Sequence, residues 1–254
     1  MRGYLCEDSL EGIFTGIYDA WASGLGHDGV RVLMKNQYEP EFFMEYEEIL
    51  PDSEKAEKVA RSIRRKISAE AFRAVYRTAV SREPERADII YRFLVEGFRY
   101  GRETLQLLQL PAVRRLFEVD RMVGNEAHRY LEFIRFEQMK NGVLFAEISP
   151  KSRVVTLVAS HFADRFPDEN WVIYDDVHGE AAIHGAGKDW AVAGLSLEEA
   201  DTYRRNQGVS DEYEDLWKTF FEATGIRERE NYHCQRNFLP LWYRKHMTEF
   251  SSSR

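Results

Sequence analysis

Hydrophobic residues recur every three or four positions along most of the first 140 residues, the spacing of helices with one buried face. Asp8 or Ser9 can cap the first of these helices, and Ser68 lies where one helix ends and the next begins. The pattern predicts helices over about residues 9–23, 53–67, 69–79 and 86–100, and a central helix from Pro111 to about Lys140.

Short apolar runs between glycine-containing turns predict strands instead. Two of them lie near the N-terminus, at Tyr4–Cys6 and Val30–Met34, and the run Glu39–Glu48 fits either a surface connection or a short helix. After Asn141-Gly142 the pattern changes to strands at 143–148, 171–176, 181–184 and 190–193, with helices at 154–166, 197–206 and 211–224. We therefore expect an α+β fold: a mainly helical single domain over residues 1–250 with a small antiparallel sheet, and a frayed tail over 251–254.

The stretch Asn125–Lys140 has helical spacing but more than one apolar side. Its remaining side holds His128, Glu132 and Arg135 at spacings of four and three. We expect a helix through the middle of the domain, with these polar groups in a cleft or an internal network. The first apolar side comprises Ala127, Tyr130, Leu131 and Ile134, and the second comprises Phe133 and Phe136.

Composition limits the class of protein. With 254 residues, of which 44% are hydrophobic, the chain is long enough to bury a sizeable core. Its apolar runs are too short to cross a bilayer, and Glu7 and Asp8 precede any hydrophobic signal region, so we expect a cytoplasmic protein without a membrane partner. Cys6 and Cys234 lack the spacing that holds zinc or an iron–sulfur cluster, so we expect no metal and no cofactor.

Basic residues are concentrated between Lys58 and Arg82, although the net charge of the chain is −8. Glu70 is the one acidic residue in this stretch. Arginine side chains on two consecutive helices can contact phosphates, or they can form a solvated face that is balanced by acidic neighbours in space. The candidates for nucleic-acid binding here are Arg61, Arg64, Arg65, Lys66, Arg73 and Arg77.

A second basic segment, Ile226–Met247, alternates Arg227, Arg229 and Arg236 with aromatic residues. Arginines supply phosphate contacts, and aromatic rings stack on exposed bases, which single strands and flipped bases require. The alternative is a C-terminal arm that packs its aromatic rings onto the body of the protein. That alternative is favoured for Trp242 and Tyr243, which follow Pro240.

Candidates for acid–base chemistry are His128, His161, Glu126 and Arg135. His161 and Arg165 project into the apolar side of the helix that starts at Val154, so they need a buried partner such as Asp175 or Asp176. His161 is then a titrating group or, alternatively, a structural histidine bonded to a carboxylate or the backbone. Arg129, Glu132, Arg165 and Asp175 complete the expected cleft or polar network. The HExxH, GxSxG and GxxxxGK[ST] motifs are absent, which removes the usual signatures of zinc, α/β-hydrolase and P-loop enzymes.

Several segments together carry a family resemblance: YLCEDSLEGIF at 4–14, RRKIS at 64–68, EAHRYLEFIRF at 126–136, HFADRF followed by WVIYDD at 161–176, and YEDLWKTFF followed by IRERENYHCQ at 213–235. In order and spacing the chain resembles a bacterial family of DNA metabolism proteins whose molecular function is unknown. The resemblance implies a partner, a radical-SAM DNA-modification or repair protein, and related domains are fused to uracil-DNA-glycosylase-like domains. It assigns no catalytic residues. A chain without cluster-binding cysteines fits this partnership, because radical initiation then belongs to the other protein.

Three hypotheses follow. In the first, the protein is a DNA-associated accessory protein in DNA repair or modification that binds nucleic acid, the radical-SAM partner or both. In the second, it is an enzyme acting on a nucleic-acid base or a small anionic substrate, with His128 or His161 as acid or base. In the third, it is a protein-interaction scaffold without DNA contact. Convergence of His128, Arg135, His161 and Arg165 on one open pocket is the geometry that the enzyme hypothesis requires.

Overall fold

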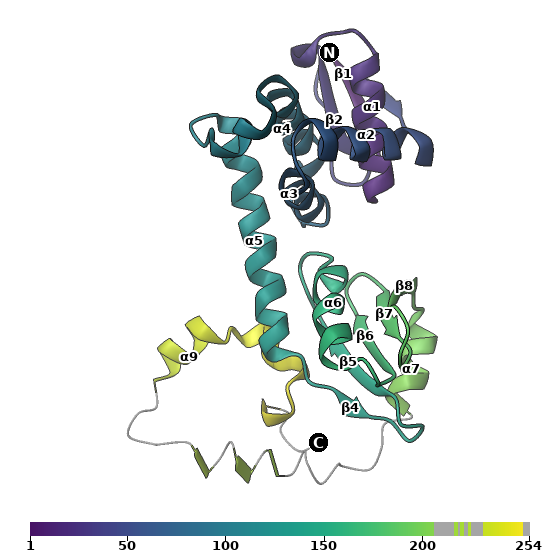
Figure 1. Ribbon diagram of the computed structural model, residues 1–254, viewed down its shortest axis with the longest axis vertical. Coiled ribbons are helices and arrows are strands. Elements are labelled where there is room, and N and C mark those ends of the chain that lie inside the picture. Colours follow the sequence, from purple (N-terminus) through teal and green to yellow (C-terminus); the bar gives the residue numbers. More distant parts are fainter. Residues whose placement is uncertain (206–215, 218, 221–222, 225–230, 251–254) are drawn as a thin grey trace. The chain divides into compact units, whose positions relative to one another are not determined.

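A computed structural model describes residues 1–205, 216–217, 219–220, 223–224 and 231–250 (Figure 1). The chain forms two compact units, Met1–Asn125 and Glu126–Arg254, which we call unit 1 and unit 2. The longest helix, α5 (Pro111–Phe133), contributes residues to both. The prediction of a single domain over residues 1–250 stays a prediction. Among the described residues, no helix is both long and apolar enough to span a bilayer.

Unit 1 contains a three-stranded sheet in which β1 (Arg2–Cys6) lies between β2 (Val30–Met34) and β3 (Glu45–Glu48) and runs parallel to both. Parallel neighbours need a crossover, which for β1 and β2 is provided by α1 (Leu10–Ala22) and the short 3-10 helix η1 (His27–Gly29). The Ser9 side chain, one of the two caps that the sequence allows, caps α1 by accepting a hydrogen bond from the backbone N–H of Gly12. Ile13, Phe14 and Ile17 of this helix are fully buried.

Three more helices complete unit 1 beside the first part of α5: α2 (Ser53–Lys66), α3 (Ala69–Ala79) and α4 (Arg86–Tyr100), the last continued by the 3-10 helix η2 (Gly101–Gln106). The Asp52 side chain caps α2, and Ser68 caps α3. Ile63 and Ile67 are fully buried, so the predicted hydrophobic stripe of this segment faces the core. The predicted helices in this part of the chain are therefore confirmed.

Unit 2 contains a five-stranded sheet in the order β4-β5-β6-β7-β8. The parallel pair β5 and β6 is joined by α6 (Val155–Arg165), and the other neighbours are antiparallel. After the sheet come α7 (Leu197–Arg205), α9 (Tyr232–Phe238) and the 3-10 helices η4 (Leu241–His246) and η5 (Thr248–Phe250). The strands are β4 (Glu137–Gln138), β5 (Leu144–Ile148), β6 (Trp171–Asp175), β7 (Glu180–His184) and β8 (Ala191–Gly194).

The α+β class is confirmed, but the expectation of one small antiparallel sheet is confirmed only in part, for three of the neighbouring strand pairs of unit 2. Unit 1 has a wholly parallel sheet, and the sheet of unit 2 is mixed. In each sheet a helix joins two neighbouring strands: α1 lies between β1 and β2, and α6 between β5 and β6. The helix brings the chain back to the end of the sheet where the first strand began, so the two strands run parallel. The segment Glu39–Glu48 is neither a plain connection nor a helix, because its end pairs with β1 as β3. The predicted helix 211–224 and the tail 251–254 lie largely outside the described residues.

The predicted helix through Lys140 ends earlier, at Phe133. Beyond it, β4 pairs with β5, and the N–H of Met139 donates to the carbonyl of Val143 at 2.9 Å. Gly142 has a φ of 82°, a conformation that glycine adopts without strain, so Asn141-Gly142 forms the turn between the two strands. Pairing with the next strand across this tight turn therefore overrides the helical spacing of this short segment.

Burial of the Cys6 thiol in unit 1 predicts a pH dependence of stability. Burial raises the pKa of this thiol from 9.0 to about 12. The folded protein then holds a proton that the unfolded chain releases, so the thiol's contribution is complete below pH 9 and is lost as the pH rises toward 12. We expect the free energy of unfolding to fall by about 1.4 kcal/mol per pH unit in this range relative to a Cys6→Ala variant.

Urea unfolding of both proteins at several pH values from 8 to about 11 measures this difference. Ionisation of lysines and exposed tyrosines is common to the two proteins and cancels in the comparison. Equal slopes of stability against pH would show that the thiol ionises in the folded state.

Candidate functional site

The basic residues of α2 and α3 divide into paired and unpaired groups. Arg61 is paired with Glu57 at 2.6 Å, and Arg77 with Asp120 at 3.4 Å. The charges of these two arginines are therefore balanced by acidic neighbours, and no bound phosphate is needed to balance them. Arg65 is exposed and forms no ion pair among the described residues.

Three further cations of this surface also lack a carboxylate partner in the described part of the chain. The guanidinium of Arg64 lies 3.7 Å from the centre of the Phe72 ring, and the Lys66 ammonium lies 5.5 Å from that of Phe98. Arg73 is exposed on α3. We call Arg64, Arg65, Lys66 and Arg73 the basic surface of unit 1; such groups keep their charge available to an anion.

The C-terminal basic segment is only partly described. Arg227 and Arg229 lie outside the described residues, and Arg236 is exposed on α9. Tyr232 and Phe238 of the same helix are also exposed, at 67% and 76%. These side chains are thus available for contact with a partner.

Trp242 and Tyr243 follow the alternative prediction and pack on unit 2. The Tyr243 ring is buried 4.9 Å from that of Tyr130, and the guanidinium of Arg129 lies 6.0 Å from it. The Lys151 ammonium lies 3.3 Å from the centre of the Trp242 ring. This end of the C-terminal arm is therefore part of the hydrophobic packing.

The residues of the predicted cleft meet different partners. The His128 side chain is 71% exposed, and its Nε2 lies 3.3 Å from Glu132 on the surface of α5. Arg135 donates to Glu249 at 2.8 Å. Burial raises the pKa of that carboxyl, but its hydrogen bonds and the positive charge of Arg135 together outweigh burial, and the pKa lies below its ordinary value. The expectation of a cleft lined by His128 is wrong, because this side of the helix faces solvent.

His161 and Arg165 are also exposed, which corrects the expectation that they enter the apolar side of α6. The ring of His161 lies edge-on to Phe162, and Arg165 lies over Phe166. The buried side of α6 comprises Val155, Val158, Ala159 and Phe162. The buried side of α6 therefore differs from the predicted one and does not include His161 or Arg165. Neither polar side chain needs a buried partner.

Asp175 is fully buried at the end of β6, but its partner is His178 and not His161 or Arg165. Its two oxygens accept hydrogen bonds from the backbone N–H groups of Val177 and His178 at 3.0 Å and contact the His178 ring at 2.6 Å. Glu126 is also buried, and it accepts a 2.7 Å hydrogen bond from the backbone of Lys151. Both carboxylates thus hold the turns at the carboxyl end of the parallel strands.

A polar cluster beside these turns was not predicted. Ser149 Oγ lies 2.8 Å from Nε2 of His246, which lies 3.8 Å from Asp176. Ligand atoms of Glu147, Asp176 and His246 lie within 4.8 Å of one another, which suits a divalent cation. The ammonium of Lys245, however, contacts Asp176, so the cluster contains a cation of its own.

Charge balance in this cluster is visible in the acidity of Asp176. Burial raises the pKa of its carboxyl, but hydrogen bonds from Lys245 and Ser149 outweigh burial and leave the pKa below its ordinary value. No local pattern could have revealed the cluster, since about 100 residues separate Ser149 from His246.

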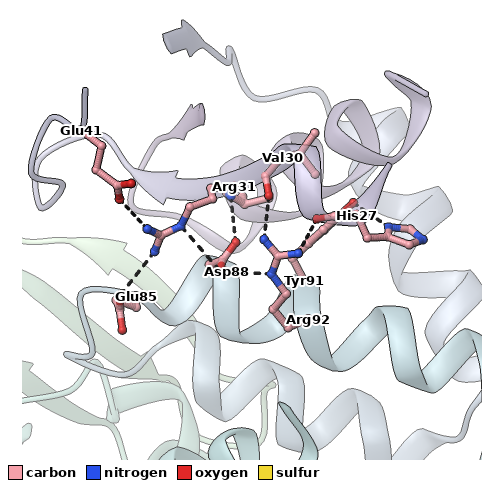
Figure 2. Close-up of polar contacts among 9 residues, drawn as sticks. His27, Val30, Arg31, Glu41, Glu85, Asp88, Tyr91 and Arg92 are labelled. Carbon is pink, nitrogen blue, oxygen red and sulfur yellow. Dashed lines mark hydrogen bonds and ion pairs between the residues drawn. The ribbon is translucent and has the colours of Figure 1, made fainter. Parts of the chain in front are cut away.

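A second network, in unit 1, joins β2 and η1 to α4 (Figure 2). The Asp88 carboxylate lies between the guanidinium groups of Arg31 and Arg92, at 3.8 and 3.3 Å. Arg92 also donates to the carbonyl groups of His27 and Val30. These bonds connect η1 and β2 to α4, so we assign the network a structural role.

The same network positions the rings of His27 and Tyr91. Nδ1 of His27 lies 3.0 Å from the Tyr91 hydroxyl, and burial raises the pKa of Tyr91 to about 12. The His27 ring in turn lies 4.6 Å from that of Trp21 on α1. The network thus supports a tryptophan at the surface of unit 1.

A protein-family model described as a domain of unknown function, DUF4130, matches residues 84–249. No curated protein gave a match. Among solved structures, a DHH-domain protein described as a member of a family of ribosomal proteins is similar at 14% identity and a TM-score of 0.25, over 67% of this chain and 53% of that one. This chain therefore spans about half the length of that structure, and so weak a likeness bears on neither fold nor function. Because the family model matches more than half of the chain, the protein belongs to the family described as domain of unknown function DUF4130.

Proposed function

We propose that the protein is a DNA-associated accessory protein that binds nucleic acid through the basic surface of unit 1. The observation that carries this proposal is that Arg64, Arg65, Lys66 and Arg73 lack carboxylate partners among the described residues of a chain with a net charge of −8. An acidic protein gains little solubility from an unbalanced cationic surface, whereas phosphates are attracted to it. The guanidinium of Arg64 is held against the Phe72 ring, which limits the conformational entropy lost on binding.

The resemblance to DNA metabolism proteins supports a place in DNA repair or modification in the cytoplasm, beside a radical-SAM partner. The exposed Arg236, Tyr232 and Phe238 of α9 offer a second surface to DNA or to that partner. Among the described residues, His128, Arg135, His161 and Arg165 contact different partners, so these contacts give the enzyme hypothesis no support.

Charge reversal tests the DNA contact. We expect Arg65→Glu/Arg73→Glu to weaken binding of a fluorescent oligonucleotide by at least about tenfold, and to reduce the slope of log affinity against log salt by about two, because two phosphate contacts are lost. Fluorescence anisotropy with single- and double-stranded DNA at several salt concentrations measures both quantities. Lys140→Glu/Lys188→Glu, an equal charge change at two exposed residues of unit 2, is the matched control.

The same variants separate DNA binding from the scaffold hypothesis. Co-purification with the radical-SAM protein, followed by anisotropy on the complex, gives the two affinities independently. Loss of partner binding with DNA binding intact would assign the basic surface to a protein interface. No binding of any oligonucleotide at low salt, with or without the partner, would overturn the proposed function.

A further inference from the structure

A cavity of about 330 Å³ opens between α1, α2 and α4 of unit 1, next to the basic surface. Ile17 and Val59, both buried, form its base. Its walls are aromatic, because Tyr18 and Trp21 come from α1 and Phe98 comes from α4. A volume of this size accommodates a small flat ligand.

The aromatic wall is held in place by its neighbours. The Trp21 ring lies 5.3 Å from that of Phe98, nearly perpendicular to it, and contacts the rings of His27 and Tyr91 on its other sides. His27 is fixed in turn by Tyr91 (Figure 2). Even so, Trp21 stays 39% exposed. Contacts with three rings hold Trp21 in place, and its exposed part can stack on a planar ligand in the cavity that it lines.

Two lysines of α2 line the same cavity. The ammonium of Lys58 lies 6.0 Å from the centre of the Tyr18 ring, and that of Lys66 lies 5.5 Å from the centre of the Phe98 ring. Lys58 is paired with Glu54 at 2.8 Å, so among the described residues Lys66 is the lysine of the two without a carboxylate partner. Ser62 adds a hydroxyl between them. Among the described residues that line the cavity, none is a carboxylate. Aromatic walls beside ammonium groups suit a ligand that joins an aromatic ring to a phosphate.

A second cavity in unit 1 offers a contrast. It has a volume of about 430 Å³, but its lining combines Asp28, Glu85, Asp88 and Glu96 with Arg92 and Arg115. Asp88 and Arg92 pair with each other, as Figure 2 shows, and the surplus of carboxylates repels phosphate. The cavity between α1, α2 and α4 therefore suits a phosphate because the charged residues that line it are all basic, and not because of its volume.

We propose that this cavity takes up an unpaired nucleobase, with the adjoining phosphate on Lys66. The inference rests on the proposed function, since Lys66 belongs both to the basic surface and to the cavity. A base in a duplex is stacked and paired, so the cavity selects single-stranded or flipped bases. The same chemistry admits a free nucleotide, which the experiment distinguishes.

The test compares single strands with duplexes. Trp21→Leu and Lys66→Gln are titrated by anisotropy, and a single strand that carries 2-aminopurine reports stacking by quenching of its fluorescence. We expect quenching by the wild type and about tenfold weaker single-strand binding for Trp21→Leu, with duplex affinity changed less than twofold. Tyr100→Leu is the matched control, an aromatic residue of α4 that is 38% exposed outside the cavity.

Each outcome has a separate meaning. Equal losses of single-strand and duplex affinity in Trp21→Leu, or no loss and unchanged quenching in both variants, would overturn the base pocket and leave the proposed DNA contact standing. Binding of deoxyadenosine monophosphate as tightly as the oligonucleotide, lost in Trp21→Leu, would assign the cavity to free nucleotides and overturn the DNA part of the inference. Failure of the wild type to bind any oligonucleotide would overturn the proposed function itself. Thermal unfolding of each variant confirms that it is folded.

Discussion

Replacing Asp8 with asparagine is expected to lower the free energy of unfolding of the protein by about 2 kcal/mol. The Arg86 side chain is 2% exposed, and its Nη2 lies 2.5 Å from Oδ1 of Asp8. Its other contacts, Gln37 at 2.6 Å and the carbonyl of Glu83 at 2.9 Å, are uncharged. Without Asp8, a buried guanidinium keeps its charge and loses its counterion. The effect is smaller than for a fully buried pair because Asp8 is 39% exposed.

Urea unfolding followed by circular dichroism measures this change, with Asp28→Asn, at an exposed aspartate, as the control. A double variant sharpens the test. Asp8→Asn/Arg86→Met removes both charges, so we expect its loss in free energy of unfolding to be smaller than the sum of the losses in the two single variants. If Asp8→Asn alone changes the free energy of unfolding by less than about 0.5 kcal/mol, the buried cation does not depend on its ion pair.

The second large effect is expected at Gly16 of α1, where replacement by alanine should destabilise the protein by about 2 kcal/mol. A Cβ atom at this position meets the Sγ atom of Cys6 on β1 at 2.1 Å, and Val32 on β2 closes the same space at 3.4 Å. The helix therefore packs on the sheet through a glycine because no larger residue fits. The stabilisation of about 1 kcal/mol that alanine brings to a helix only partly offsets this overlap.

Removing the sulfur atom should reverse the defect. We expect Cys6→Ala/Gly16→Ala to be more stable than Gly16→Ala, because the second substitution vacates the space that the new methyl group needs. Gly29→Ala is the control, since its Cβ meets only Leu25 at an ordinary 3.6 Å. Thermal or urea unfolding of these variants suffices, and a double variant no more stable than Gly16→Ala would place the strain elsewhere.

The basic surface could be predicted because its information is local. Helical spacing separates Ile63 and Ile67 from Arg64 and Arg65 within a few residues, and the structure confirms that separation. The pairing of Arg61 with Glu57 follows the same local spacing. That Arg77 is neutralised by Asp120 could not be predicted, since 43 residues separate them.

The cavity of unit 1 could not be predicted for a related reason. The spacing of Trp21 places it on the hydrophobic side of α1, which indicates a core residue. Trp21 is nevertheless partly exposed, because it contacts His27, Tyr91 and Phe98 at the edge of the packed core. A pattern in one helix tells which side is apolar, but not how far neighbouring elements cover that side.

By itself the sequence determined the helices of unit 1, the cap at Ser68, and the concentration of basic residues on α2 and α3. These features depend on residues within one or two helical turns of each other. Only the tertiary structure decided where α5 ends, that both sheets contain parallel pairs, and that Asp175 binds His178 and not His161. Parallel strand pairing and the buried side of α6 depend on partners far along the chain, and their energies outweigh local spacing wherever the two conflict.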